Sequence, residues 1–61
     1  MAAIIWEWII IDPIGRYRVV WAYTRNAAIS KHSRETGMPE DYIREKCKIV
    51  RGKYVLSEHD G

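Results

Sequence analysis

The chain has 61 residues, a formal net charge of +2 and a single cysteine, Cys47. So short a chain forms one domain, 1–61, and buries only about 60% of its unfolded surface, so association with another chain is an expected aid to its stability. A single cysteine cannot form an intrachain disulfide. One cysteine and two histidines are too few ligands for a Cys₂His₂ or Cys₄ zinc site. The small net charge does not require a nucleic-acid partner.

The first predicted element is a β-hairpin within residues 4–23, a stretch that contains all three tryptophans. Its turn is the motif Asp12-Pro13-Ile14-Gly15. Proline at the second position presets φ to about −65° and so excludes the primed two-residue turns. We therefore expect a type I turn followed by a glycine bulge at Gly15, which places Ile11 opposite Tyr17.

This register divides the apolar side chains of the hairpin between the two faces of the sheet. One face carries Trp6, Trp8 and Val20. The other face needs a separate cover, which makes it the candidate interface for a protein partner or a second copy. Its members are Ile5, Ile9, Ile11, Tyr17, Val19, Trp21 and Tyr23.

A register shifted by one residue is the alternative, because a slip of one changes which side chains share a face. Trp6 and Trp8 would then share a face with Tyr17 and Trp21. That register needs Asp12 inside a four-residue loop, where a residue before proline resists the α region. The bulged turn is therefore the favoured prediction.

Two short helices are predicted to follow the hairpin. Thr24, or alternatively Asn26, is the N-cap of the first helix, and Gly37 suits its left-handed C-terminal position. The buried stripe of this helix is Ala28, Ile29 and His32.

The second predicted helix begins with Pro39 as its first residue and ends near Lys46. Its inward side is expected to carry Tyr42, Ile43 and Cys47.

The segment 48–56 is predicted to be β-structure. A short hairpin turning at Arg51-Gly52 is favoured, and a single strand with a bulge at Gly52 is the alternative. Residues 57–61 are expected to form a frayed tail. The predicted fold class is therefore α+β: an N-terminal antiparallel β-hairpin, two short helices, and a C-terminal strand or short hairpin.

The runs 17–29 and 35–39 resemble a strand-into-helix pattern of short, uncharacterised proteins from phages and mobile elements. The resemblance covers about a third of the chain. It implies no activity and no functional residues. It implies a genomic setting in which small proteins, anti-CRISPR proteins among them, inhibit or redirect a host machine.

No arrangement of residues predicts catalysis. His32 lies between Ser30 and Ser33, but residues two apart in a helix lie on different faces, and no oxyanion loop is evident. Cys47 is expected to be a packed structural thiol, and no metal-binding spacing is present. We therefore expect no enzymatic activity, no metal and no cofactor.

Basic residues concentrate in the segment 44–53, which has a charge of +4 from five positive residues and one negative residue, Glu45. Basic groups beside exposed aromatic rings can bind phosphates and stack bases. Lysines along a strand also protect sheet edges from aggregation. The candidate phosphate-binding residues are Arg16, Arg18, Arg44, Lys46, Lys48, Arg51 and Lys53.

The leading functional prediction is a non-enzymatic protein-binding module that is homodimeric through the hairpin face and acts as a stoichiometric inhibitor or regulator of a larger, host protein complex. The alternative is a small nucleic-acid-binding accessory protein that uses residues 44–53. No apolar run approaches the roughly 20 residues that span a membrane, and the first residues do not resemble a signal peptide. We therefore expect no membrane partner and a cytoplasmic location, in the host cell if the protein is phage-encoded.

Overall fold

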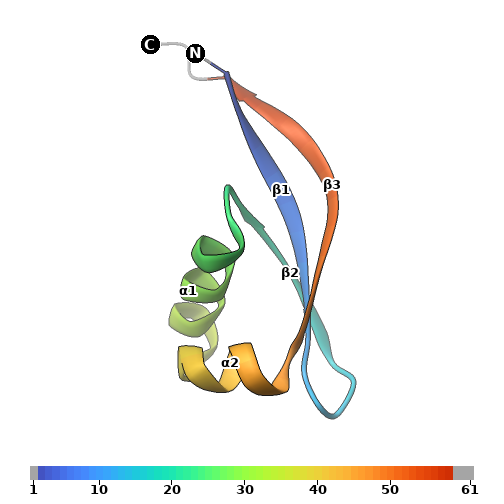
Figure 1. The fold of residues 1–61 in the computed structure, drawn as a ribbon, viewed down its shortest axis with the longest axis vertical. Helices are drawn as coiled ribbons and strands as arrows, with labels where there is room; N and C mark the ends of the chain where they lie inside the picture. The colour runs from blue at the N-terminus through green and yellow to red at the C-terminus, as the bar shows by residue number, and fades with distance from the viewer. Residues whose placement is uncertain (1, 59–61) are drawn as a thin grey trace.

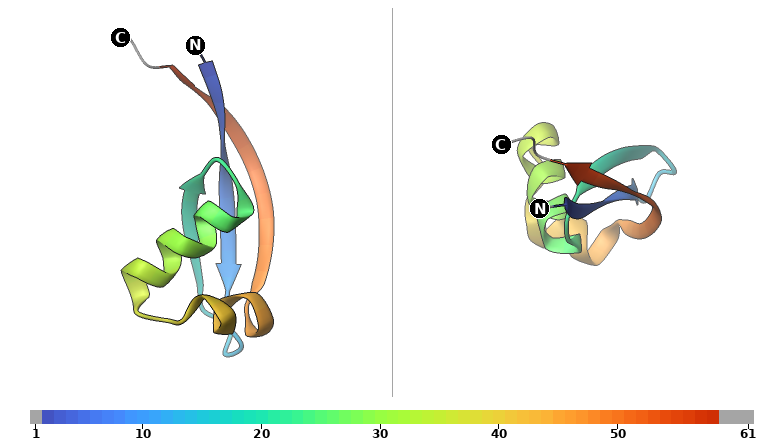
Figure 2. Two further views of the ribbon diagram at one scale, coloured as in Figure 1. Left: turned by 60° about the vertical axis from the view of Figure 1, so that its left-hand side comes forward. Right: turned by 90° about the horizontal axis from the view of Figure 1, so that it is seen from above.

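A computed structural model describes residues 2–58, which form a three-stranded antiparallel sheet with two helices on one side (Figures 1 and 2). The elements in chain order are β1 (Ala2–Ile11), β2 (Tyr17–Ala22), α1 (Arg25–Thr36), α2 (Glu40–Lys46) and β3 (Lys48–Glu58). The strand order is β2-β1-β3, so β1 is the central strand. The α+β class predicted from the sequence is confirmed, and the last strand is long rather than short.

The turn between β1 and β2 has the predicted bulged form. The Gly15 amide donates to the carbonyl oxygen of Asp12 at 3.0 Å, and the Asp12 amide donates to that of Arg16 at 2.8 Å. Gly15 has a φ of 93°, which a residue with a side chain adopts only at a cost. Ile11 pairs with Tyr17, so the favoured register is correct and the shifted one is wrong.

The last strand, β3, is a single strand that pairs with β1 along its length. The favoured hairpin at Arg51-Gly52 is therefore wrong, and the bulge that was its alternative is present. Two residues of β3, Gly52 and Lys53, lie opposite the single residue Glu7 of β1. A Cβ at position 52 would meet the end of the Glu7 side chain, which would have to move aside.

The strand β3 continues to Ser57 and Glu58, which pair with Ala3 and Ala2. The first two residues of the expected frayed tail are therefore part of the sheet. The remaining tail residues, 59–61, lie outside the described residues.

The core lies between the helices and one face of the sheet. Ile10 of β1, Ile29 of α1 and Ile43 of α2 are its largest fully buried side chains. The Trp8 indole nitrogen donates to the carbonyl oxygen of Ala22 at 3.1 Å, so this buried polar group is satisfied. Among the described residues, the buried apolar side chains are Trp8, Ile10, Val20, Ala22, Ala28, Ile29, Ile43 and Cys47.

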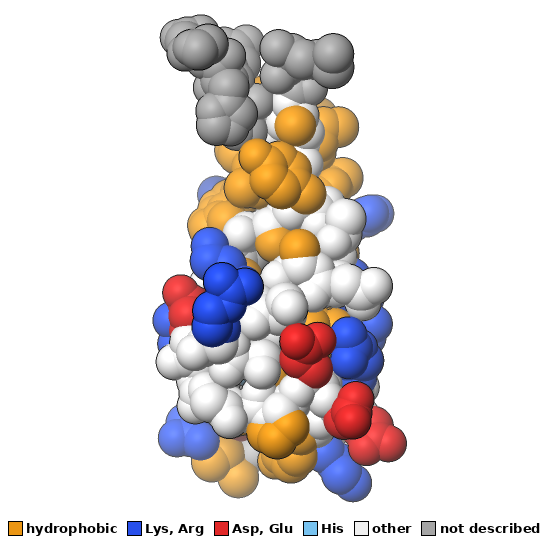
Figure 3. Space-filling model, turned by 90° about the vertical axis from the view of Figure 1, so that its left-hand side faces the viewer, with side chains coloured by type: hydrophobic (Ala, Val, Ile, Leu, Met, Phe, Trp, Pro, Cys, Tyr) orange, Lys and Arg blue, Asp and Glu red, His pale blue; other side chains and the backbone are white. Residues whose placement is uncertain are grey.

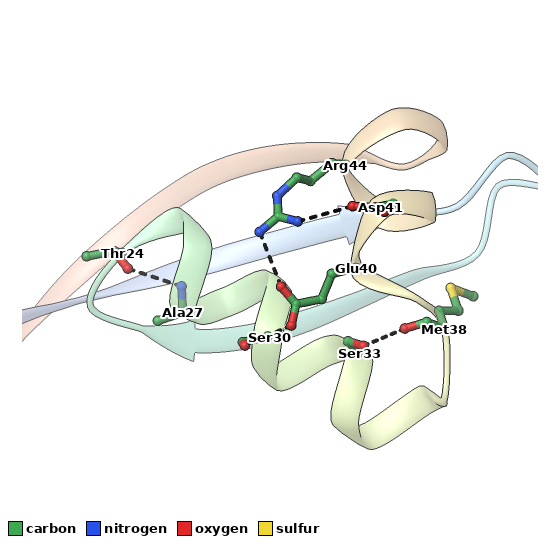
Figure 4. Close-up of polar contacts among 8 residues, drawn as sticks. All are labelled: Thr24, Ala27, Ser30, Ser33, Met38, Glu40, Asp41 and Arg44. Carbon is green, nitrogen blue, oxygen red and sulfur yellow. Dashed lines mark hydrogen bonds and ion pairs between the residues drawn. The ribbon is translucent and has the colours of Figure 1, made fainter.

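Helix α1 has the predicted ends and the predicted buried stripe. The Thr24 hydroxyl accepts from the Ala27 amide at 3.1 Å (Figure 4). Gly37 adopts a φ of 81°, and its amide donates to the carbonyl oxygen of Ser33. Its buried residues are Ala28, Ile29 and His32.

Helix α2 differs from its prediction in two details. Pro39 is the N-cap, so the first helical residue is Glu40. Tyr42 is 40% exposed and does not join Ile43 and Cys47 in the core, because this seven-residue helix turns only a narrow side to the sheet.

Two single isoleucine-to-alanine variants, one at a buried position and one at an exposed position, test which residues form the core. Ile43→Ala is expected to lower the free energy of unfolding by about 2–5 kcal/mol, because it leaves a cavity at a fully buried site. Ile14→Ala, at a turn position that is 74% exposed, is expected to change it by less than about 0.5 kcal/mol. Denaturant unfolding measures both, and equal losses would contradict the described core.

Candidate protein interface on the open sheet face

Both helices cover the same side of the sheet, and no described element covers the other side. Strand alternation places Trp8, Ile10 and Val20 toward the helices, so their neighbours along each strand point away from them. We call this uncovered side the open face. Its apolar members are Ile5, Ile9, Ile11, Tyr17, Val19, Trp21, Val50 and Val55.

The open face combines exposed side chains with half-buried ones. Tyr17 is 72% exposed, and Val19 and Val55 are 42% and 46% exposed. The isoleucines of the central strand and Trp21 are only partly exposed, because side chains of the flanking strands shield them. The result is an apolar surface that runs along three strands.

The structure brings together six of the seven residues that the sequence placed in the candidate interface. The seventh, Tyr23, follows the end of β2 and is 47% exposed. Val50 and Val55 were missed, because they join the face only if β3 is one continuous strand. Their alternation with Ile49 and Leu56 was the available signal.

Polar groups on the open face lie around the bulge and at the first residue of β3. The Lys53 amide lies 3.5 Å from a Glu7 carboxylate oxygen, a long hydrogen bond. Lys48 pairs with Ile11 and so lies on the same face. These groups give the apolar surface a few charged positions.

Beyond β2, the ends of β1 and β3 form a two-stranded projection that we call the arm, residues 2–5 and 55–58. It extends past both helices and contributes to the 40 × 19 × 14 Å shape of the molecule (Figure 1). On the helix side, Ile4 is 47% and Leu56 is 60% exposed. Figure 3 shows hydrophobic side chains gathered at this end, whereas charged side chains are spread over the helical part.

The candidate phosphate-binding residues do not form one surface. Arg16 and Arg18 make ion pairs at 3.1 Å with Asp12 and Glu35 respectively. The Arg51 guanidinium lies over the Trp6 ring, 4.3 Å from its centre.

Arg44 is the fourth of these arginines to be engaged within the chain. It contacts Glu40 at 3.2 Å and Asp41 at 3.8 Å, and Glu40 also accepts from the Ser30 hydroxyl of α1 (Figure 4). Glu40 therefore links the two helices, and Arg44 pairs with it from the same helix.

A cleft of about 310 Å³ lies between the hairpin turn and the end of α1. Its lining residues are Ile10, Asp12, Arg16, Tyr17, Arg18, His32, Thr36 and Met38. The pKa of Asp12 is lowered: burial raises it, but hydrogen bonds from Arg16 and the Ile14 amide outweigh that effect. Within the cleft, Asp12 pairs with Arg16, whereas Arg18 pairs with Glu35, which lies outside the lining.

His32, the residue considered for catalysis, is 4% exposed, and its Nδ1 atom has no hydrogen-bond partner among the described residues. The nearby serine hydroxyls are used elsewhere: Ser30 bonds Glu40, and Ser33 bonds the carbonyl oxygen of Met38. The cleft therefore contains no serine hydrogen-bonded to the imidazole.

Burial raises the pKa of the Cys47 thiol, and the nearby negative charge of Asp12 raises it further. This cysteine lies in the core, which favours the unreactive thiol form.

Within residues 2–58, no group of three or more His, Cys, Asp and Glu side chains is placed to hold a metal ion. None of the described helices is long and apolar enough to cross a membrane. Comparisons with protein-family models, curated proteins and solved structures found no match. The surface itself is therefore the basis for a functional proposal.

The stability of the domain is expected to fall as the pH decreases below 6.5. Burial lowers the pKa of His32 from 6.5, as does the charge of Arg18, and Glu35 and Asp12 offset this only in part. Arg16 is the remaining charged group that lines the cleft. The pKa of His32 is therefore higher in the unfolded chain than in the folded protein. Protonation of His32 as the pH falls thus favours unfolding.

The measurement is the free energy of unfolding at pH 7 and pH 5.5 in a His59→Asn background, which removes the other histidine. His32→Leu in the same background is expected to reduce the pH dependence. An equal pH dependence in both proteins would contradict the assignment to His32. The Asp12 carboxyl does not contribute between pH 7 and pH 5.5, because its pKa is lowered from the ordinary value of 3.8.

Proposed function

We propose that this protein is a non-enzymatic protein-binding module whose open face docks on another protein, either a second copy or a larger complex that it inhibits or regulates stoichiometrically. The observation that carries the proposal is the uncovered sheet side described above. The resemblance to small phage and mobile-element proteins adds the expectation that the larger partner belongs to a host cell.

The exposed area of the open face suits a protein interface. Side chains along three strands, about 3.4 Å apart per residue and 4.8 Å apart per strand, present several hundred square ångströms of largely apolar surface. Contiguous apolar patches of that size on soluble proteins mark interaction sites. A specific interface needs about 500 Å² or more from each partner, which is of the same order as this face.

The side-chain chemistry also favours a protein partner over nucleic acid. Trp21 and Tyr17 are of the residue types enriched at binding hot spots. In contrast, Arg16, Arg18, Arg44 and Arg51 already contact carboxylates or an aromatic ring within the chain. A nucleic-acid partner would have to compete with these contacts.

A threonine variant tests the open face without removing strand propensity. The triple substitution Tyr17→Thr, Val19→Thr and Val50→Thr keeps β-branched or strand-compatible residues at exposed positions while it removes apolar area. We expect it to abolish capture of the partner complex from host lysate by the immobilised protein, and to disrupt any contact between copies that forms through the open face.

The matched control is the double variant Ile14→Thr and Tyr42→Thr, at exposed positions away from the open face. It is expected to bind as the wild type does. Equal binding by the triple variant would overturn the proposal. A nucleic-acid-binding protein would instead lose its partner on nuclease treatment. In that case Arg44→Glu and Lys48→Glu would be the substitutions that weaken binding.

A further inference from the structure

The central strand of the sheet has an unpaired edge in the arm. β2 pairs with β1 only from Trp6 to Ile11, ending with Ala22 opposite Trp6. Residues 2–5 of β1 are therefore bonded to β3 on one side, and on the other side no described strand pairs with them.

The hairpin turn shows which main-chain groups point toward this edge. Because the Asp12 amide donates to Arg16 across the hairpin, the even-numbered residues of β1 direct their N–H and C=O groups toward the β2 side. In the arm these residues are Ala2 and Ile4. Their amides and carbonyls face the free edge, whereas Ala3 and Ile5 direct theirs toward β3.

This edge lacks the features that protect the other two edges of the sheet. The outer edge of β3 carries Lys48, Arg51 and Lys53 and a bulge, and β2 is short and carries Arg18. Lysine, bulges and short strands are the usual means of preventing strand addition. The free edge reads Ala-Ala-Ile-Ile, with no charge, no proline and no bulge.

The arm is also apolar on both of its faces. Ile4 and Leu56 are exposed on the helix side, and Val55 is 46% exposed on the open side. Residues 2–6 and 54–56 carry no charged side chain, and the one charged residue of the arm, Glu58, belongs to β3 and not to the free edge. A two-stranded ribbon is only marginally stable in water, so this arm gains from additional strands.

We propose that two copies of the chain pair through the free edges of their arms, with the two β1 strands antiparallel about a two-fold axis. The occupant is a second copy because the edge is self-complementary: antiparallel strands related by a two-fold axis close into a dimer and present identical surfaces to each other. The free edge, residues 2–5, carries no charged side chain that would select a charged foreign strand. The resulting strand order is β3-β1-β1-β3 across the two arms.

The directions of the main-chain groups determine the register. Ala2 of each copy lies opposite Ile4 of the other, which forms about four main-chain hydrogen bonds. Ala3 then lies opposite Ala3 of the second copy. A shift by two residues would place Ala2 opposite Trp6, which already pairs with β2.

This edge is a different surface from the open face, so the inference does not rest on the proposed function. The two-fold axis is perpendicular to the sheet, because paired antiparallel residues share a face. Both open faces therefore lie on the same side of the joined sheet and stay uncovered. The dimer presents a doubled apolar surface to a larger partner.

Cysteine crosslinking tests the register. In a Cys47→Ala background, Ala3→Cys is expected to form a disulfide-linked dimer under mild oxidation, because facing residues at a non-hydrogen-bonded position have Cα atoms about 4.5 Å apart. Ile5→Cys is the matched control, on the same strand and face. Its two copies would lie about 13 Å apart, which is beyond the reach of a disulfide.

Light scattering over a concentration series tests the edge independently. Ile4→Pro removes an amide that faces the free edge and keeps the bonds of Ala3 and Ile5 to β3, so it is expected to shift the dimer toward monomer. The triple threonine variant of the open face is expected to remain dimeric. A wild type that is monomeric at millimolar concentration, or equal crosslinking of Ala3→Cys and Ile5→Cys, would overturn the inference.

The two proposals fail in distinguishable ways. If the threonine variant dissociates and Ile4→Pro does not, the dimer forms through the open face and the arm inference is wrong. If Ala3→Cys crosslinks but the threonine variant still captures the partner, the arm pairs copies and the open face is not the binding surface. Should Ile4→Pro fail to fold, as circular dichroism would show, the crosslinking pair decides.

Discussion

The five-residue connection 12–16 between β1 and β2 is the constraint on which the rest of the structure depends. The left-handed conformation of Gly15 and the two main-chain bonds between Asp12 and its partners set a register in which tryptophan and isoleucine side chains alternate to opposite faces. Had the register slipped by one residue, most aromatic side chains would share one face. The observed turn instead produces a sheet that is apolar on both sides.

The helical layer can cover only one of these sides. α1 has 12 residues and α2 has seven, and the small residue Ala28 lets α1 approach the sheet closely around Ile29. All the helical residues that the structure describes lie on that side. An apolar open face thus follows from a strongly apolar hairpin whose two described helices both pack on one side of the sheet.

The ion pairs on the surface affect which charged groups are available for binding more than they affect the stability of the fold. Exposed pairs such as Arg18 with Glu35 contribute little to stability, since water and salt screen them. They do, however, occupy guanidinium groups that a phosphate would need. The basic residues of β3 have a second consequence: they protect the outer edge of the sheet and leave the uncharged edge in the arm as the one suited to strand pairing.

The sequence by itself determined the features that depend on neighbours a few residues apart: the turn at Gly15, the caps Thr24 and Gly37, and the buried stripe of α1. Six of seven candidate interface residues followed from that turn, because strand alternation transmits its register along the hairpin. Only the tertiary structure decided that β3 is one strand, because its pairing joins residues more than 40 positions apart, such as Glu7 and Lys53. The local sequence at Gly52 favours a turn. The pairing of β3 with β1 instead makes Gly52 part of a bulge opposite Glu7.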